Sequence, residues 1–171
     1  MLKRHFLAWV APVILLAVVL VFIALRPHSA RVLQPINYNH KIHINTVGLG
    51  CNDCHLYTSK LASAGIPTLE TCQTCHGDKP LSESPEEQKL LTYVAQGKEI
   101  PWVRVHEVPD HVYFSHRRHV LLGNLECSEC HGNVAEREEP FTFPVKPITM
   151  KNCLKCHGEK GVTNDCLACH H

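Results

Sequence analysis

Apolar residues are concentrated at one end of this chain and scattered elsewhere. Residues 6–25 contain no charged side chain and are rich in Val, Leu, Ile and Ala. At a rise of about 1.5 Å per residue, roughly twenty such residues can cross the hydrocarbon core of a bilayer. Pro12 lies in the first third of the run, where a membrane helix tolerates proline. The pattern therefore predicts an N-terminal transmembrane helix.

A cleaved signal peptide is the alternative interpretation of the same run. Signal peptides have a shorter apolar core and small residues before the cleavage point. Ala30 would fit one of the two small-residue positions, but His28 would occupy the other. We therefore expect residues 1–30 to remain as an uncleaved anchor.

One clear amphipathic helix follows, within a domain that spans residues 31–171. Ser84 can cap this helix, Pro85 suits its first turn, and Gly97 suits its end. Its apolar stripe consists of Leu90, Leu91, Tyr93 and Val94. We expect the stripe to pack within the domain. The rest of the domain is predicted to be mostly coil with short α-helices.

All ten cysteines belong to Cys-x-x-Cys-His motifs. We number the five motifs in chain order: Cys51-Cys54-His55, Cys72-Cys75-His76, Cys127-Cys130-His131, Cys153-Cys156-His157 and Cys166-Cys169-His170. This spacing is the attachment signature of a c-type haem, in which both thiols form thioethers and the histidine is the proximal iron ligand. The sequence therefore predicts five covalently bound haems.

Other uses of paired cysteines explain the motifs less well. A zinc site does not require a histidine after each second cysteine. A disulfide framework explains neither the spacing nor the histidines, and a thioredoxin-like motif would occur once, near a βαβ pattern.

Composition changes the picture of the core. Residues 31–171 contain few Phe, Trp or long aliphatic runs, so they could not bury an ordinary core for a domain of this size. We expect haems packed against one another to take its place. The formal net charge of +1 gives no support for nucleic-acid binding.

An internal repeat predicts the sixth iron ligands, which in low-spin haems are usually His or Met. Residues 38–43 (YNHKIH) and 114–119 (FSHRRH) each precede a haem motif by seven residues. We therefore expect a two-haem module at 38–80, a helix and linker at 81–105, and a second module with the fifth haem at 106–171. The predicted distal ligands are His40, His43, His116 and His119. Histidines three apart share a helical face, so each pair can reach two neighbouring haems.

The fifth haem needs a distal ligand from elsewhere. His106 ranks first, because it lies in a segment that the first module lacks. Met150 ranks second, although its counterpart in the repeat is Leu69, and His111 ranks third. His171 directly follows a proximal ligand, so it is geometrically unsuited to its own haem.

The aromatic-x-His-x-x-His pattern ahead of each haem motif resembles the cytochrome c3 and c7 class. That resemblance implies that His40 serves the first haem, that His116 serves the third, and that His43 and His119 cross to others. Residues 101–106 (PWVRVH) and 109–116 (PDHVYFSH), with the anchor and five motifs, resemble the pentahaem subunit of alternative complex III. They are also similar to the related multihaem subunit of the quinone reductase complex of sulfate reducers, which carries a sixth haem.

The resemblance to the subunit of alternative complex III implies a quinol-oxidising complex of the bacterial inner membrane. Its other members would be an integral quinone-binding subunit and an iron–sulfur, molybdopterin-oxidoreductase-like subunit. A mono-haem cytochrome or another periplasmic protein would accept the electrons. Charges flanking the anchor are balanced, so they do not fix its orientation. Because c-type haems are attached outside the cytoplasm, we expect a cytoplasmic N-terminus and a periplasmic haem domain.

These patterns favour an electron-transfer subunit without catalytic residues of its own. The alternative is a stand-alone, single-anchor quinol dehydrogenase that feeds a periplasmic reductase. That class has a haem motif soon after the membrane helix, whereas Cys51 lies well beyond Leu25. A multihaem reductase is disfavoured because it needs an iron with an open position, and spare ligands exceed haems here.

Overall fold

The structure is a computed structural model of the chain, and it describes residues 14–16, 21, 31–77 and 79–170. The chain divides into two units, Met1–Arg31 and Val32–His171. The predicted anchor falls largely outside the described residues, as does the candidate His171. Within the described ranges, the structure contains no helix that is both long and apolar enough to span a membrane.

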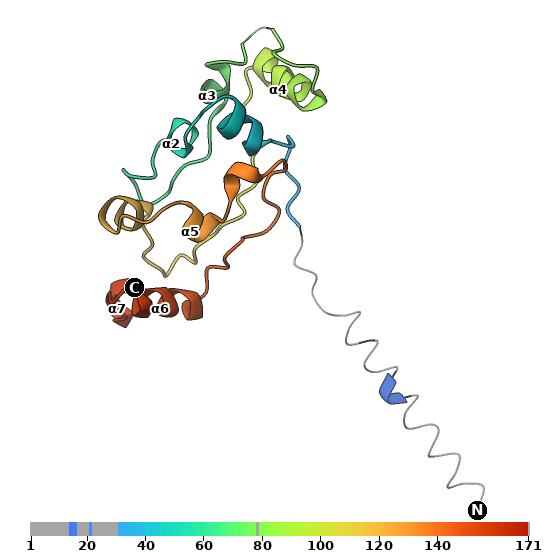
Figure 1. Cartoon of the computed structure of the whole chain (residues 1–171). Helices are drawn as coiled ribbons and strands as arrows, with labels where there is room; N and C mark the ends of the chain where they lie inside the picture. The colour runs from blue at the N-terminus through green and yellow to red at the C-terminus, as the bar shows by residue number, and fades with distance from the viewer. Residues whose placement is uncertain (1–13, 17–20, 22–30, 78, 171) are drawn as a thin grey trace, which may run out of the picture. The chain divides into compact units, whose positions relative to one another are not determined.

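Short helical segments joined by loops make up the second unit (Figure 1). In chain order they are η1 (Ile42–Thr46), α2 (Cys51–Cys54), α3 (Leu69–Gln73), α4 (Pro85–Gln96), η2 (Arg118–Leu122), α5 (Ser128–His131), η3 (Val134–Glu136), α6 (Met150–Glu159) and α7 (Cys166–Cys169). The described residues form no strand, although an isolated antiparallel bridge joins Val112 to His170. The prediction of mostly coil with short helices is confirmed.

Helix α4 begins and ends where its sequence predicts. The Ser84 hydroxyl accepts a hydrogen bond from the Glu86 N–H, and Pro85 occupies the first turn. Gly97 ends the helix in the left-handed region, with φ 60°, where glycine has no Cβ to clash. Leu90 on the apolar stripe is buried, and Tyr93 and Val94 pack beside it. The stripe therefore packs within the domain, as expected.

The protein core is small. Among the described residues, the buried apolar side chains are Ile36, Leu69, Leu90 and Ile100. They form one cluster where α3 meets α4, and no described side chain is fully buried. A unit of this length would ordinarily bury far more apolar surface. The small cluster agrees with a domain whose interior is completed by prosthetic groups.

Candidate haem sites

Each Cys-x-x-Cys-His motif forms a turn of helix. In four of the motifs the histidine N–H donates to the carbonyl of the first cysteine at 2.9 Å: His55 to Cys51, His76 to Cys72, His131 to Cys127 and His170 to Cys166. The fourth motif lies inside α6. Positions i, i+3 and i+4 share one helical face. Both thiols and the imidazole of a motif therefore project to the same side, as attachment to one porphyrin requires.

The alternative uses of cysteine find no matching geometry. All ten cysteines are free of disulfides. Over the described ranges, no group of three or more His, Cys, Asp or Glu side chains is arranged to hold a metal ion. A tetrahedral zinc site needs four such ligands together.

The two His-x-x-His segments fold alike. A π-helical turn follows each first histidine, η1 after His40 and η2 after His116. An aromatic ring stacks on each second histidine: Tyr38 on His43 at 4.4 Å and Phe114 on His119 at 4.7 Å between ring centroids. The repeat in the sequence is therefore a repeat in the structure, although the sequence did not predict the π-helical form.

Histidines of the repeat face proximal histidines across gaps of one size. Ring centroids are 6.1 Å apart for His43 and His76, 6.4 Å for His116 and His131, and 6.2 Å for His119 and His157. Imidazoles on opposite sides of one metal ion, each at the about 2 Å usual for histidine ligands, have ring centres roughly 6 Å apart. The separation of the rings in each pair therefore matches that of two imidazoles bound to one iron.

Hydrogen bonds at the other ring nitrogen fix which nitrogen faces each gap. Nδ1 lies 2.7–2.9 Å from an oxygen atom in six of these histidines: His43, His55, His76, His116, His119 and His157. Nδ1 therefore carries the proton and Nε2 is left as the ligand atom. Metal-binding histidines usually show this arrangement.

Burial favours the neutral form of two further histidines, His40 and His131. Burial, with a smaller effect from the neighbouring His55, lowers the pKa of His40 to about 4. The pKa of His131 also falls to about 4 through burial, with a smaller effect from His106 and His116. The neutral form of imidazole is the one that binds metal. Because His55 contributes to the shift in the pKa of His40, the two side chains lie near each other.

The fifth motif is approached by His111. Its ring lies 5.6 Å from that of His170, at an interplanar angle of 16°. The bridge between Val112 and His170 and a 2.8 Å hydrogen bond from the Tyr113 N–H to the Cys169 carbonyl hold the two segments together. The Met150 sulfur also lies close, 3.4 Å from His170 Nε2.

His106, ranked first for the fifth haem, lies beside the third motif instead. Its ring meets the edge of His131 at 4.7 Å, and burial followed by the nearby His116 lowers its pKa. His106 Nε2 is buried without a hydrogen-bond partner, as is His40 Nδ1. Buried polar atoms are rarely left unpaired, so both mark places that a further group would complete.

The motifs follow one another in a row. Beyond the larger effect of burial, a thiol of one motif raises the pKa of a thiol of another in five cases: Cys54 acts on Cys72, Cys75 on Cys54, Cys51 on Cys127, Cys156 on Cys130, and Cys169 on Cys153. The second motif is thus next to the first, the first to the third, the third to the fourth, and the fourth to the fifth. The helices follow the same course in Figure 1, from α3 through α2 and α5 to α6 and α7.

Comparison with known proteins agrees with this geometry. Residues 42–141 match the family model described as cytochrome c3, which is more than half of the chain. The chain belongs to the cytochrome c3 family. Residues 112–171 of this cytochrome also match the model for cytochrome c7 and related cytochrome c. Membership of these families implies that this cytochrome carries covalently bound c-type haems.

A curated relative is similar over most of its length. The multiheme cytochrome c subunit of menaquinone reductase from Nitratidesulfovibrio vulgaris (strain Hildenborough) is 34% identical to this cytochrome over 161 residues. The match covers 80% of this chain and 76% of the relative.

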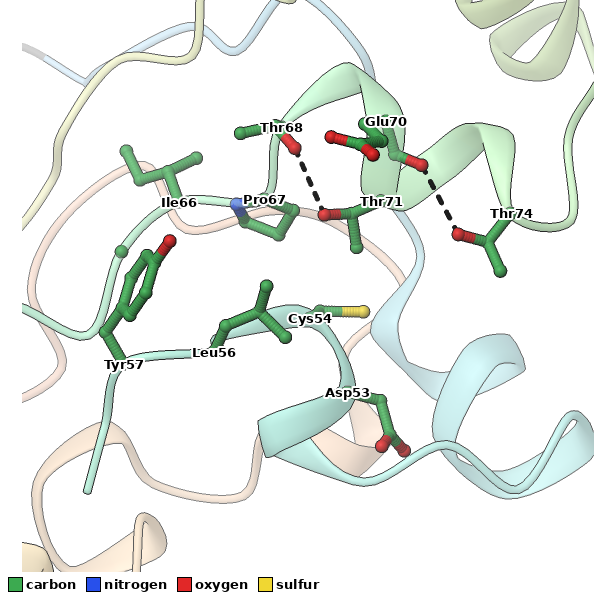
Figure 2. A pocket seen from close by; sticks show the side chains of 11 residues that line it. Asp53, Cys54, Leu56, Tyr57, Ile66, Pro67, Thr68, Glu70, Thr71 and Thr74 are labelled. Atoms are coloured by element: carbon green, nitrogen blue, oxygen red, sulfur yellow. Dashed lines mark hydrogen bonds between the residues drawn. The ribbon is translucent and has the colours of Figure 1, made fainter. Parts of the chain in front are cut away.

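A pocket of about 400 Å³ lies between the first two motifs of this cytochrome. Figure 2 shows Leu56 and Cys54 on one side facing Pro67 and Thr71 on the other. Its size is in the range in which proteins bind small organic groups. A group attached through Cys54 would lie close to Leu56 and Pro67.

One residue of the site was missed from the sequence. Glu87 in α4 is buried, and its carboxylate lies 2.7 Å from His76 Nδ1. In the sequence it is only an acidic residue near a helix start, where the helix dipole favours it. The loop that brings His76 back to α4 has no signal that would have shown this contact.

Proposed function

We propose that this cytochrome is the electron-transfer subunit of a membrane quinol-oxidising complex. The observation that carries the proposal is the pairing of imidazoles. Four proximal histidines have a second histidine ring at 5.6–6.4 Å between centroids: His76, His131, His157 and His170. The fifth, His55, is near enough to His40 to affect its pKa. Haem supplies one-electron chemistry, and two imidazoles on one iron keep it six-coordinate. Such an arrangement suits transfer of electrons with little rearrangement and leaves no position for a substrate.

The pairing assigns all five haems their ligands in this proposal. The pairs are His40 with His55, His43 with His76, His116 with His131, His119 with His157, and His111 with His170. Each His-x-x-His segment thereby joins two motifs, because its histidines serve different haems. His111 takes the place that the sequence ranking gave to His106, because the C-terminal bridge brings it to the fifth motif.

The link to quinone is supported by the relative from Nitratidesulfovibrio vulgaris, which is a subunit of a menaquinone reductase. In our proposal residues 6–25 anchor this cytochrome in the bacterial inner membrane, with the haem domain in the periplasm. The partners are an integral quinone-binding subunit and an iron–sulfur, molybdopterin-oxidoreductase-like subunit, as in alternative complex III. The electron acceptor is a mono-haem cytochrome or another periplasmic protein.

Two measurements test the proposal. Intact mass of the native chain under denaturing conditions is expected to show five covalent haems. In the purified membrane complex, a menaquinol analogue is expected to reduce those haems, and an inhibitor of the partner's quinone site is expected to block the reduction. Three or fewer haems would contradict the assignment of the motifs.

The isolated chain supplies the control. Without partners it is expected to accept electrons from dithionite but not from quinol, and its ferrous form is expected to bind little carbon monoxide. Reduction of the isolated chain by quinol would favour the stand-alone dehydrogenase instead. Stoichiometric binding of carbon monoxide would indicate an open iron and favour an enzyme.

A further inference from the structure

The carboxylate of Glu87 is held in a fixed position beside the second motif. One oxygen, Oε1, accepts hydrogen bonds from His76 Nδ1 at 2.7 Å and from the Leu81 N–H at 2.8 Å. The other oxygen accepts from the N–H and hydroxyl of Ser82 at 2.7 and 2.5 Å. These four bonds use the accepting capacity of an ionised carboxylate. Its orientation toward His76 is therefore built into the loop and the start of α4.

Hydrogen bonding also keeps this carboxyl ionised. His76, the Leu81 N–H, and the N–H and hydroxyl of Ser82 all direct their polar hydrogens at its two oxygens, and hydrogen bonds to the charged form of a carboxyl favour that form. An ionised carboxylate can only accept hydrogen bonds, so the proton between the two groups belongs to His76 Nδ1.

The other ring hydrogen bonds end on neutral acceptors. His55 and His157 donate from Nδ1 to the backbone carbonyls of Gly65 and Thr163. The distal histidines His43, His116 and His119 likewise donate to backbone carbonyls. Among the ring hydrogen bonds of the described residues, the one from His76 alone ends on a charged group. His157 is its counterpart in the repeat, so the two modules differ at this point.

A charged acceptor changes what the imidazole does at a metal. It draws the Nδ1 proton toward itself and makes the ring a stronger electron donor at Nε2. The buried negative charge also favours the more positive, oxidised state of a nearby centre. Both effects act in the same direction, because each stabilises ferric over ferrous iron. Hydrogen bonding to an axial ligand is one of the main means by which a protein sets haem potential.

We propose that Glu87 is a positioning residue that lowers the reduction potential of the haem at the second motif. This inference rests on the proposed role of His76 as an iron ligand. The second motif is at one end of the row, next to α4, so the effect makes that end lower in potential than it would be with a neutral acceptor. The matching haem at the fourth motif lacks this feature.

The test is a redox titration of the purified, haem-loaded full chain, followed by visible absorbance and electron paramagnetic resonance. Glu87→Gln retains an acceptor of similar shape but removes the charge. We expect one of the five haem potentials to move to a more positive value, the others to stay, and one low-spin ferric signal to change. All five haems should remain attached by mass. The titration needs neither quinol nor partner subunits. A negative result would therefore contradict the role of Glu87 without contradicting quinol oxidation by the complex, and a failure of quinol to reduce the haems would leave the role of Glu87 intact.

Two variants are matched controls for charge. Glu86→Gln removes a charge one residue away, where the carboxylate binds Lys89 and the Asn37 N–H. Glu99→Gln removes a charge that acts on Cys72 of the same motif without touching its histidine. Both are expected to shift the potentials by much less than Glu87→Gln, because neither carboxylate contacts His76. An equal shift in Glu99→Gln would show a general field effect, and no shift in Glu87→Gln would overturn the proposal.

A second variant guards against misfolding of the first. Glu87→Asp keeps the charge but withdraws it by one methylene, which lengthens the contact with His76. We expect a positive shift in the same haem, smaller than that in Glu87→Gln. A shift in a different haem, or a negative shift, would also overturn the proposal.

Discussion

Histidine side chains carry most of the chemistry of this cytochrome, and their two ring nitrogens have separate tasks. In six of the histidines of the proposed pairs, Nδ1 is fixed by an oxygen acceptor within the protein. Nε2 is then free to face a metal with a defined tautomer. The hydrogen-bond acceptor of Nδ1 can therefore differ between haems while the ligand atom, Nε2, stays the same. A difference in this acceptor can give otherwise similar haems different reduction potentials.

The fifth haem gives the sharpest test at this scale, because His111 and Met150 both lie beside His170. We predict that Met150→Leu leaves all five ferrous haems unable to bind carbon monoxide. His111→Ala should allow the thioether to replace the imidazole, which raises the potential of one haem. The double variant should bind about one carbon monoxide per chain. The readouts are carbon monoxide titration and redox titration.

The same experiment has a control in His106. His106→Gln should leave every haem six-coordinate, because this residue lies beside the third motif. Carbon monoxide binding by Met150→Leu alone would instead identify the thioether as the ligand. Binding by His106→Gln would restore the ranking that the sequence favoured.

Some features of these residues could be predicted from the sequence and others could not. The motifs and the His-x-x-His repeat were predictable because both are fixed local spacings. The partner of each histidine was not, because His43 and His76 are brought together by a loop of the fold. His111 ranked third for the same reason: its approach to His170 depends on a bridge between distant segments. Glu87 gave no signal beyond its place near a helix start.

At the scale of elements, α4 is the part of the domain that an ordinary apolar core stabilises. We predict that Leu90→Ala lowers the free energy of unfolding by about 2 kcal/mol, at the low end for such a change, because surrounding loops can relax. The measurement is chemical denaturation of the haem-loaded chain followed by far-ultraviolet circular dichroism. Gln88→Ala, at an exposed position of the same helix, should change little. An equal loss in both variants would contradict the role of the cluster.

The helix was predictable because capping, proline placement and an apolar stripe all act within a dozen residues. The π-helical turns were not. They depend on i to i+5 bonds such as that from the Val47 N–H to the Ile42 carbonyl, 3.0 Å long. Spacing alone could indicate a shared face for His40 and His43, but a wider turn changes the angle between the two rings. That angle comes from packing, including the stacked Tyr38.

At the scale of the whole molecule, the haem domain has its own contacts and is divided from the N-terminal unit. We predict that a chain starting at residue 31, exported behind a cleavable signal peptide, is released from membranes and retains five haems. The full chain should stay with membranes after a carbonate wash. Cell fractionation with haem staining checks both results. A full chain that is released by the wash, or a native N-terminus near residue 31, would contradict the anchor.

The order of the motifs in space was beyond the sequence. Chain order would place the second motif between the first and the third, whereas the structure places it at an end, next to α4. The cause is the connection through α4, which packs against α3 rather than passing between the modules. No local sequence pattern indicates that α4 packs against α3.

The scarcity of buried side chains has a consequence for biogenesis. With so small an apolar cluster, the polypeptide without its prosthetic groups has little to offset the entropy of ordering its loops. We therefore expect it to meet the haem-attachment machinery as an open chain, and to condense only as thioethers form. Until then its ten thiols are exposed to oxidation. Yield in a foreign host should thus depend on reductant supply and the rate of haem ligation more than on the stability of any helix.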